Sequence, residues 1–318
     1  MTLAAINWPA LALLLLEGLV FSWAALVLYT GWILTHPPRR SRGWAVARSL
    51  PSDPAELTPS RAFEADDRAI LAGLRCPVWH VPGDDPAGPV VIVSHGWGES
   101  RVHGLARLAA LLPSASRVIL WDMPGHGDAA GRCHLGRLEP ELLRALIDSA
   151  VGPPPTGRVV LYGSSLGAGV SIAAAASDAR VIGVIAEAPY RLPQTPASNM
   201  LRIRGLPNLG SVRAAMTLLG GVAWQHSAGP FDRAAIASRV TAPLLVIHGD
   251  LDHVCPPADG AAIAQDAPTG EWMSIPGAAH LNLWTDEQFR PRIAAAVGKF
   301  MQRLTPGPAA YAGSSRQT

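Results

Sequence analysis

The segment Arg158–Gly169, which reads RVVLYGSSLGAG, most strongly constrains the fold of this chain. A short apolar run, Val159–Tyr162, leads into the sequence GSSLG, and an alanine-rich stretch of helical character, Val170–Ser177, follows at once. A G-x-S-x-G motif between a strand and a helix is typical of a tight turn that lifts one serine hydroxyl above the edge of a sheet. The motif therefore predicts that Ser165 is a nucleophile.

Glycines lie two positions before and two positions after this serine, at Gly163 and Gly167. They remove side chains that would clash in so sharp a turn, and they tolerate strained backbone dihedral angles. The same pattern is compatible with a glycine-rich turn that carries no chemistry, so the interpretation depends on what the rest of the chain supplies.

A serine hydroxyl becomes a good nucleophile only beside a base and an orienting acid, which in this architecture follow it along the chain. An apolar run at residues 244–248 ends in a turn that carries Asp250 and Asp252, and the short predicted strand 271–275 is followed by His280. The two acids and the histidine all follow strand ends, where open α/β sheets hold their sites. A histidine after a strand is often only a solvated loop residue, but this order favours His280 as the base.

Apolar segments that alternate with helical stretches predict a mostly parallel sheet with helices on both faces, within one domain at about residues 61–304. The predicted strands lie near residues 76–81, 90–94, 117–121, 158–162, 181–186, 244–248 and 271–275.

Five short motifs follow the predicted strands in this region. They are HGWG at 95–98, DMPGHG at 122–127, the serine motif, HGDLD at 248–252 with Pro256, and GAAH at 277–280. With these motifs the chain resembles the α/β-hydrolase superfamily over about residues 75–304, and most closely its lipase-esterase and serine-aminopeptidase-like branch. The chain departs from the pattern at Gly127-Asp128, where a small serine commonly follows the histidine and glycine.

The resemblance implies an α/β-hydrolase fold and a catalytic triad of Ser165, His280 and Asp252. The family's acid lies three residues after the glycine that ends its strand, which corresponds to Asp252. Asp250 is the alternative, and otherwise a turn residue bonded to nearby backbone.

The resemblance also implies an oxyanion hole formed by the backbone N–H groups of Leu166 and Trp97. His95 and His126 lie in glycine turns and are expected to bond to the backbone. No metal site or cofactor is predicted, because the chain has no H-E-x-x-H motif, no cysteine pairs and no acidic calcium loop.

The second strong signal is the apolar segment Ala10–Leu34, in which Glu17 is the one ionisable residue among 25. This length can cross a hydrocarbon core of about 30 Å, and Trp8, Tyr29 and Trp32 suit the two membrane interfaces. A cleaved signal peptide would carry basic residues before a shorter apolar core, and a buried soluble helix would show polar spacing. Residues 1–34 are therefore predicted to be a transmembrane anchor, whose deletion is expected to leave a soluble, active domain.

Basic residues follow the apolar segment and none precedes it; they are Arg39, Arg40, Arg42 and Arg48. The positive-inside rule then predicts a single-pass protein, of a bacterial inner membrane, with its catalytic domain in the cytoplasm. The odd number of cysteines, three, agrees with a compartment without disulfides.

Three further segments complete the predicted organisation. Residues 35–60 contain five prolines and predict a semi-rigid linker, and residues 305–318 predict a loose tail. The long connection at about 190–239 is typical of a functional lid, and the resemblance implies a helical cap at this position, between the sixth and seventh strands of the family's sheet. Within it, the apolar run Ala214–Trp224 is too short to span a bilayer but long enough to cover an acyl pocket or touch the membrane surface. Leu218 and Leu219 are expected to contact the long acyl chains in that pocket.

The net charge of +2 is nearly balanced, and its excess is clustered beside the apolar segment, which argues against a nucleic-acid partner. The chain is therefore predicted to be a membrane-anchored serine hydrolase of an ester, thioester or amide, with a small-molecule or lipid-like acyl substrate. A serine peptidase and a non-catalytic scaffold with the hydrolase fold are the alternatives. The exact substrate, the oligomeric state and the role of Glu17 stay open.

Overall fold

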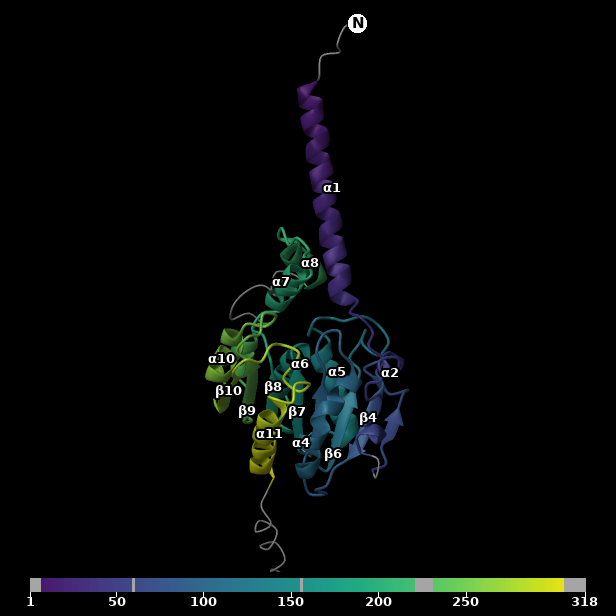
Figure 1. Cartoon of the computed structure of the whole chain (residues 1–318), viewed down its shortest axis with the longest axis vertical. Helices are drawn as coiled ribbons and strands as arrows, with labels where there is room; N and C mark the ends of the chain where they lie inside the picture. The colour runs from purple at the N-terminus through teal and green to yellow at the C-terminus, as the bar shows by residue number, and fades with distance from the viewer. Residues whose placement is uncertain (1–6, 59–60, 155–156, 221–230, 306–318) are drawn as a thin grey trace, which may run out of the picture.

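An eight-stranded sheet forms the centre of the molecule in the computed structural model, which describes residues 7–58, 61–154, 157–220 and 231–305 (Figure 1). The strand order is β1-β4-β6-β5-β7-β8-β9-β10; β4 pairs antiparallel with β1 and β6, and the remaining pairs are parallel. The strands are β1 Glu64–Asp66, β4 Val78–Pro82, β5 Val90–Ser94, β6 Arg117–Trp121, β7 Val159–Ser164, β8 Val181–Glu187, β9 Leu244–Gly249 and β10 Gly270–Ile275. The predicted mostly parallel sheet is confirmed.

Two features of the strands were not predicted. The edge strand β1 is a fully exposed three-residue segment, and β2 Ile70–Leu71 pairs with β3 Leu74–Arg75 as a separate hairpin. Segments this short and polar give no periodic signal in the sequence.

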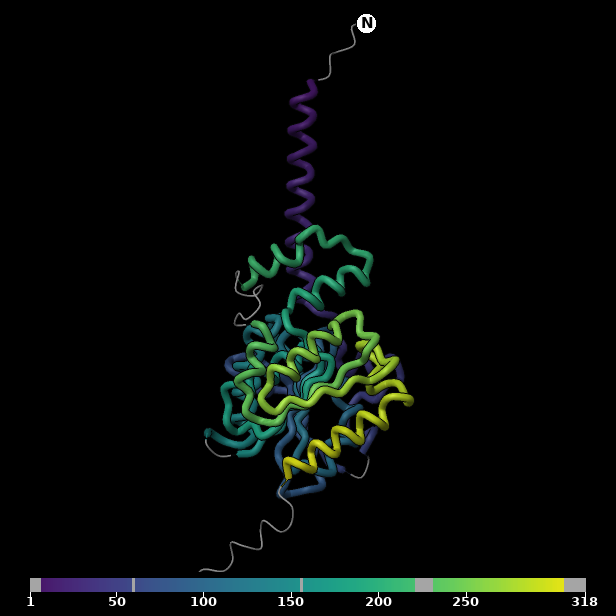
Figure 2. The backbone as a smooth tube through the Cα atoms, turned by 90° about the vertical axis from the view of Figure 1, so that its left-hand side faces the viewer, coloured from purple at the N-terminus to yellow at the C-terminus, as the bar shows by residue number. Residues whose placement is uncertain are grey.

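The central strands read as continuous apolar runs because both of their faces are covered. Every residue of β5, β7 and β9 is buried, and alternate residues of β5 belong to two separate cores. Figure 2 shows the helical layers that enclose the sheet. One face carries α5 Glu139–Val151, α6 Leu166–Ala175, α9 Arg233–Ala237 and α10 Pro257–Asp266. The other carries α3 Arg101–Gly104, η2 Leu105–Arg107, α4 Leu108–Leu111, η3 Leu112–Ser114 and α11 Arg290–Leu304.

The connection from β8 to β9 contains the predicted cap. Its described part forms α7 Gln194–Ile203 and α8 Ser211–Gly220, and residues 221–230 of the predicted segment lie outside the described residues. Both helices lie above the carboxyl ends of the strands, beside the long helix α1. The helical insertion between the sixth and seventh strands of the main sheet is thus present.

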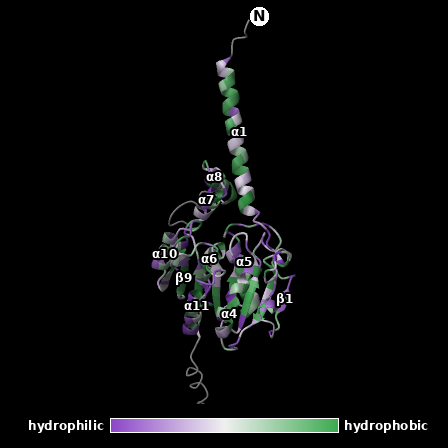
Figure 3. Cartoon of the chain, viewed as in Figure 1, coloured by the Kyte–Doolittle hydropathy of each residue, from purple (hydrophilic) through white to green (hydrophobic). Residues whose placement is uncertain are grey.

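Helix α1, Trp8–Thr35, projects from the body and is apolar along most of its length (Figure 3). It is long and apolar enough to cross a membrane. Its last turns are buried, and they pack against α8: Thr30 Oγ1 donates to Ser211 Oγ (3.0 Å), and Trp23 Nε1 donates to Leu209 O (3.0 Å). The lower third of α1 is therefore part of the folded domain.

The segment after α1, predicted as a linker, lies on the hydrolase body as far as it is described, to residue 58. It contains α2 Arg42–Val46 and η1 Pro54–Glu56, and Ala45 is fully buried. Ser100 Oγ donates to Arg40 O (2.6 Å), and Arg39 Nη1 donates to Ala129 O (2.6 Å). These contacts hold the end of α1 at a defined position over the sheet. Of the predicted tail, residues 306–318 lie outside the described residues.

Candidate active site

The predicted nucleophile, Ser165, lies in the turn that joins β7 to α6. Its φ of 50° and ψ of −109° lie in a region that non-glycine residues rarely adopt, and its backbone N–H donates to Glu187 O (2.8 Å). Strain of this kind persists only where the surroundings hold it, and it is concentrated at functional sites. The backbone here is that of a strained strand-to-helix turn, as the motif predicts.

The two flanking glycines are required by close backbone approaches. A Cβ atom on Gly163 would lie 2.2 Å from Gly167 O, and one on Gly167 would lie 2.1 Å from Ser94 O. Both distances are far inside van der Waals contact. The steric reason expected for these glycines therefore applies in the folded chain.

Asp252 and His280 follow the neighbouring parallel strands β9 and β10, whose carboxyl ends meet at the same edge of the sheet. The His280 Nδ1–H donates to Asp252 Oδ2 (2.7 Å). The other carboxylate oxygen accepts from the backbone N–H groups of Val254 and Cys255, both at 2.8 Å. The carboxylate is thus fixed on both sides.

The alternative acid, Asp250, points elsewhere. Its side chain is exposed, and its Oδ1 accepts from Gly277 N (2.7 Å) in the turn that follows β10. It braces the segment that carries His280 and makes no contact with the imidazole among the described residues.

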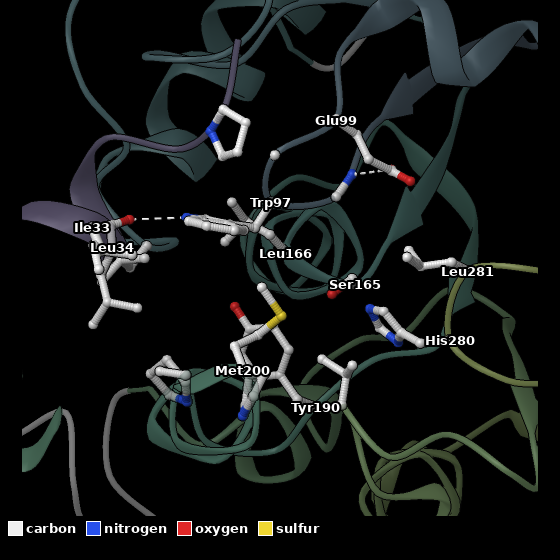
Figure 4. Close-up of a pocket in the computed structure, with 18 of the residues that line it drawn as sticks. Ile33, Leu34, Trp97, Glu99, Ser165, Leu166, Tyr190, Met200, His280 and Leu281 are labelled. Carbon is white, nitrogen blue, oxygen red and sulfur yellow. Dashed lines mark hydrogen bonds between the residues drawn. The ribbon is translucent and has the colours of Figure 1, made fainter. Parts of the chain in front are cut away.

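Ser165 and His280 line one pocket, and Figure 4 shows a ring nitrogen of His280 directed toward the Ser165 side chain (Figure 4). Within the described part of the chain no hydrogen bond joins these two residues, and Ser165 Oγ lies 3.8 Å from Cys255 Sγ. Catalytic hydrogen bonds are often long without substrate and shorten in the reacting complex.

The predicted oxyanion donors line the same pocket. Leu166 is the first residue of α6, and Trp97 lies in the loop after β5. Neither backbone N–H donates a hydrogen bond to another described residue, so both are available to a bound group. The Trp97 indole Nε1 donates to Leu34 O (2.9 Å), and Glu99 Oε2 accepts from Gly96 N (2.7 Å), which holds this loop between α1 and the sheet.

Two residues of the site were not predicted. His248 is fully buried with its Nε2 3.2 Å from Asp252 Oδ2 and 2.9 Å from Cys255 O, so Asp252 contacts two imidazoles. Cys255 lies beside the serine and the catalytic pair. In the sequence, His248 and Asp252 are four residues apart. This spacing brings side chains together on a helix but does not imply contact in a turn, so the pair was not predicted. The donor atoms of Asp252, Cys255 and His280 lie within 4.8 Å of one another and are the set here that could hold a metal.

The two histidines that were predicted to bond to the backbone, His95 and His126, do so. His95 Nε2 accepts from Met123 N (3.0 Å), and His126 Nδ1 lies 2.9 Å from Pro124 O. They hold the loops that follow β5 and β6 at the carboxyl ends of these strands.

A buried ion pair supports the nucleophile turn. Arg107 Nη2 donates to Glu187 Oε1 (2.7 Å), Trp284 Nε1 donates to Glu187 Oε2 (2.8 Å), and the Tyr162 hydroxyl donates to the same oxygen. Glu187 is 2% exposed, so its charge is balanced within the protein.

The pocket beside Ser165 is a cavity of about 150 Å³ with mainly apolar walls. They are formed by Ile33 and Leu34 of α1, Met200 and Leu201 of α7, and Leu206. The expectation that Leu218 and Leu219 cover this pocket is wrong, because neither lines it. The Leu218 side chain is 72% exposed, and Leu219 lies beside Gly31, since α8 packs against α1. Helix α7 covers the pocket in its place, and residues 221–224 of the predicted covering run lie outside the described residues.

A second cavity, of about 410 Å³, lies on another side of His280. More of its lining side chains are charged or polar, among them Arg107, Glu187 and His103, but its exposed surface is as apolar as that of the first cavity because Arg107 and Glu187 are nearly fully buried. It shares Arg40 and Glu99 with the first cavity. The two cavities therefore meet beside the candidate catalytic residues.

The surroundings of Asp252 and His280 favour the charged forms of both side chains. Burial alone would raise the pKa of Asp252, but hydrogen bonds from His248 and His280 outweigh it and lower that pKa. Burial would lower the pKa of His280, but the hydrogen-bonded Asp252 carboxylate outweighs it and raises that pKa well above 6.5. Asp252 is thus an anion at neutral pH, and an imidazolium beside it is stabilised.

Comparison with known proteins identifies the family. The sequence profile of the Alpha/beta hydrolase family matches residues 90–306, which is more than half of the chain, so the chain belongs to that family. An esterase from Pyrococcus furiosus has the same fold, with a TM-score of 0.65 and 21% identity over 86% of this chain and 99% of the esterase. No curated protein sequence matches the chain.

Two further esterases of known structure share the fold. One, from Thermogutta terrifontis, has a TM-score of 0.54 and 20% identity over 77% of this chain and 100% of its own. The other, RhEst1 from Rhodococcus sp. ECU1013, has a TM-score of 0.55 and 18% identity over 76% and 99%.

The raised pKa of His280 predicts the pH dependence of hydrolysis. A base must be neutral to accept a proton, so kcat/KM should rise with pH along a limb whose apparent pKa lies above 6.5, and activity should be lost below it. Cys255→Ala should leave that limb in place, because burial raises the pKa of this thiol and keeps it uncharged where His280 titrates. Cys133→Ala, at a buried cysteine of the α5 face, is the matched control. A limb at or below 6.5 in the unmodified enzyme would contradict this assignment.

Proposed function

We propose that the protein is a membrane-anchored serine hydrolase that cleaves a carboxylic ester with a lipid-like acyl group. The observation that carries the proposal is the strained Ser165 turn, which opens into the same apolar pocket as the hydrogen-bonded Asp252–His280 pair. The known structures that share the fold include several esterases, which supports ester over peptide cleavage.

In this mechanism His280 accepts the Ser165 hydroxyl proton as Oγ attacks the carbonyl carbon of the ester. The carbonyl oxygen becomes an oxyanion, which accepts hydrogen bonds from the N–H groups of Leu166 and Trp97. As the tetrahedral intermediate collapses, the C–O bond to the alcohol breaks, and His280 returns the proton to that alcohol. Water then attacks the acyl-serine in the same way, releasing the acid and restoring Ser165.

Asp252 has a supporting role in this cycle. Its carboxylate accepts from Nδ1–H, which leaves Nε2 as the nitrogen that exchanges protons with Ser165. The hydrogen bonds that Asp252 receives from Val254 and Cys255 keep it in that orientation.

The two cavities suit the two parts of an ester. The apolar cavity, walled by Leu34, Met200 and Leu201, fits an acyl chain, because such chains bind through apolar contact. The cavity with Arg107 and His103 fits a polar leaving alcohol.

Helix α1 is the proposed anchor, with the catalytic domain on the cytoplasmic side of a bacterial inner membrane. A cleaved signal sequence would be lost from the mature protein, whereas Ile33 and Leu34 line the pocket and Leu34 O binds the Trp97 indole. This arrangement supports retention of α1. It also disagrees with the expectation that deletion of residues 1–34 leaves an active domain, since that deletion removes part of the pocket wall.

Fluorophosphonate labelling tests the nucleophile. Ser165→Ala should abolish labelling while the circular dichroism spectrum stays unchanged, because the reagent reacts with an activated serine. Ser164→Ala, at the adjacent serine of the same pocket, should still be labelled. Persistent labelling of Ser165→Ala would refute the assignment.

Paired substitutions test the acid. Asp252→Asn should lower kcat by about 10⁴-fold, because the amide holds the imidazole in the wrong tautomer. Asp250→Asn should change kcat little, since an amide oxygen still accepts from Gly277 N. Steady-state kinetics on a nitrophenyl ester measure both, and the reverse ranking would transfer the role to Asp250.

Acyl-chain selectivity tests the wall of the pocket. Met200→Ser should raise KM about tenfold for long-chain nitrophenyl esters in detergent solution and leave that for acetate esters nearly unchanged, because only the long chain loses an apolar contact. Ile203→Ser, three residues further along α7 and 59% exposed, is the control. Equal losses for short and long esters in Met200→Ser would show that this residue does not select the chain.

A further inference from the structure

Helix α1 is longer than a bilayer requires. Its 28 residues span about 42 Å, whereas a hydrocarbon core is about 30 Å thick and needs about 20 residues. Counted from Trp8, that length ends near Val27, which is also the first buried residue of the helix. Beyond Val27 one side of the helix is buried, but Leu28, Tyr29 and Trp32 remain 67%, 51% and 58% exposed. The lower membrane boundary therefore lies between about Val27 and Trp32, where Tyr29 and Trp32 suit the interface.

The cap reaches above that boundary. Trp23 Nε1 donates to Leu209 O, and Trp23 lies four residues, or about 6 Å, above Val27 along the helix. Lower down, Thr30 contacts Ser211, and Gly31 faces Ala215. The loop between α7 and α8 is therefore fixed beside the part of α1 that would lie in lipid.

The outer surface of this part of the cap is apolar and basic. Ile203, Leu209 and Leu218 are 59%, 73% and 72% exposed. Residues 188–231 contain no acidic side chain, and Arg202 is exposed there, whereas the Arg204 guanidinium lies over the Trp97 ring at the pocket (5.4 Å). Exposed leucines together with an arginine suit the headgroup region of an anionic bilayer, where elements of this kind are buried about 5–10 Å deep.

We propose that this surface, the α7–α8 loop with the exposed side of α8, inserts into the bilayer beside α1 as a second membrane contact. The proposal rests on the anchor assigned above, and the occupant is the bilayer because the surface is continuous with α1. Leu206 lines the apolar cavity and lies three residues from Leu209. In this arrangement an acyl chain drawn from the bilayer would enter the cavity beside Leu206.

Site-specific fluorescence tests this insertion in the full chain. Single cysteines are introduced at Leu209 and Leu218, labelled with an environment-sensitive dye and reconstituted in vesicles of phosphatidylglycerol and phosphatidylcholine. The three native cysteines are buried, so the exposed position is labelled selectively. Phe21→Cys on α1 is the membrane control, and Ile70→Cys, 61% exposed on the body, is the aqueous control.

Brominated acyl chains should quench the labels at positions 21, 209 and 218, whereas aqueous iodide should quench the label at position 70. If position 21 is quenched by lipid but positions 209 and 218 are quenched by iodide alone, the cap proposal is wrong and the anchor stands. If position 21 is also quenched only by iodide, the anchor itself fails.

A functional measurement complements the labels. Leu209→Ser with Leu218→Ser should lower turnover of a long-chain ester embedded in vesicles about tenfold, because each serine removes apolar area from lipid. Hydrolysis of a soluble acetate ester should not change, as neither residue lines the catalytic pocket. Unchanged turnover of the embedded ester would overturn the proposal.

Discussion

The buried carboxylate of Glu187 is the interaction on which the geometry of the site depends. The backbone oxygen of Glu187 accepts the Ser165 N–H. The Glu187 side chain binds Arg107 of the helical layer and Trp284, four residues after His280. One residue at the end of β8 thus connects the nucleophile turn, the loop of the base and the face of the sheet. An unpaired charge at this depth would be strongly destabilising, so the network tolerates few alternative arrangements of these three segments.

The carboxyl end of helix α1 also helps to fix the geometry of the site. Its last carbonyl groups bind the protein rather than water: Leu34 O accepts from the Trp97 indole, and Thr35 O accepts from Cys133 N. Because Trp97 carries one of the two available backbone donors, the end of α1 and the candidate oxyanion site form one packed unit. A movement of α1 would be transmitted to that loop through the contact between Leu34 O and the Trp97 indole.

The sequence predicted the parts that depend on local pattern. The buried strands appear as apolar runs, and the turn of Ser165 requires glycines whose spacing is visible in the chain. The contacts of Asp252 with His248 and of Ser165 with Cys255 could not be predicted, because they depend on how a turn folds back over the sheet edge. The covering of the pocket by α7 was likewise hidden, since α7 and α8 have similar amphipathic character and only packing against α1 distinguishes them.

The two cavities relate this packing to chemistry. On one side of His280 the lining comes from α1 and α7 and is mainly apolar, whereas on the other side Arg107 and Glu187 contribute charged groups. An ester has the same division, between an acyl chain and an alcohol. Since the apolar cavity is walled by the lower end of α1, an ester whose acyl chain lies in a bilayer and whose alcohol is polar would be oriented by the two linings before reaction. The carbonyl group would then be directed toward Ser165, because the acyl chain would lie in the apolar cavity and the alcohol in the other cavity.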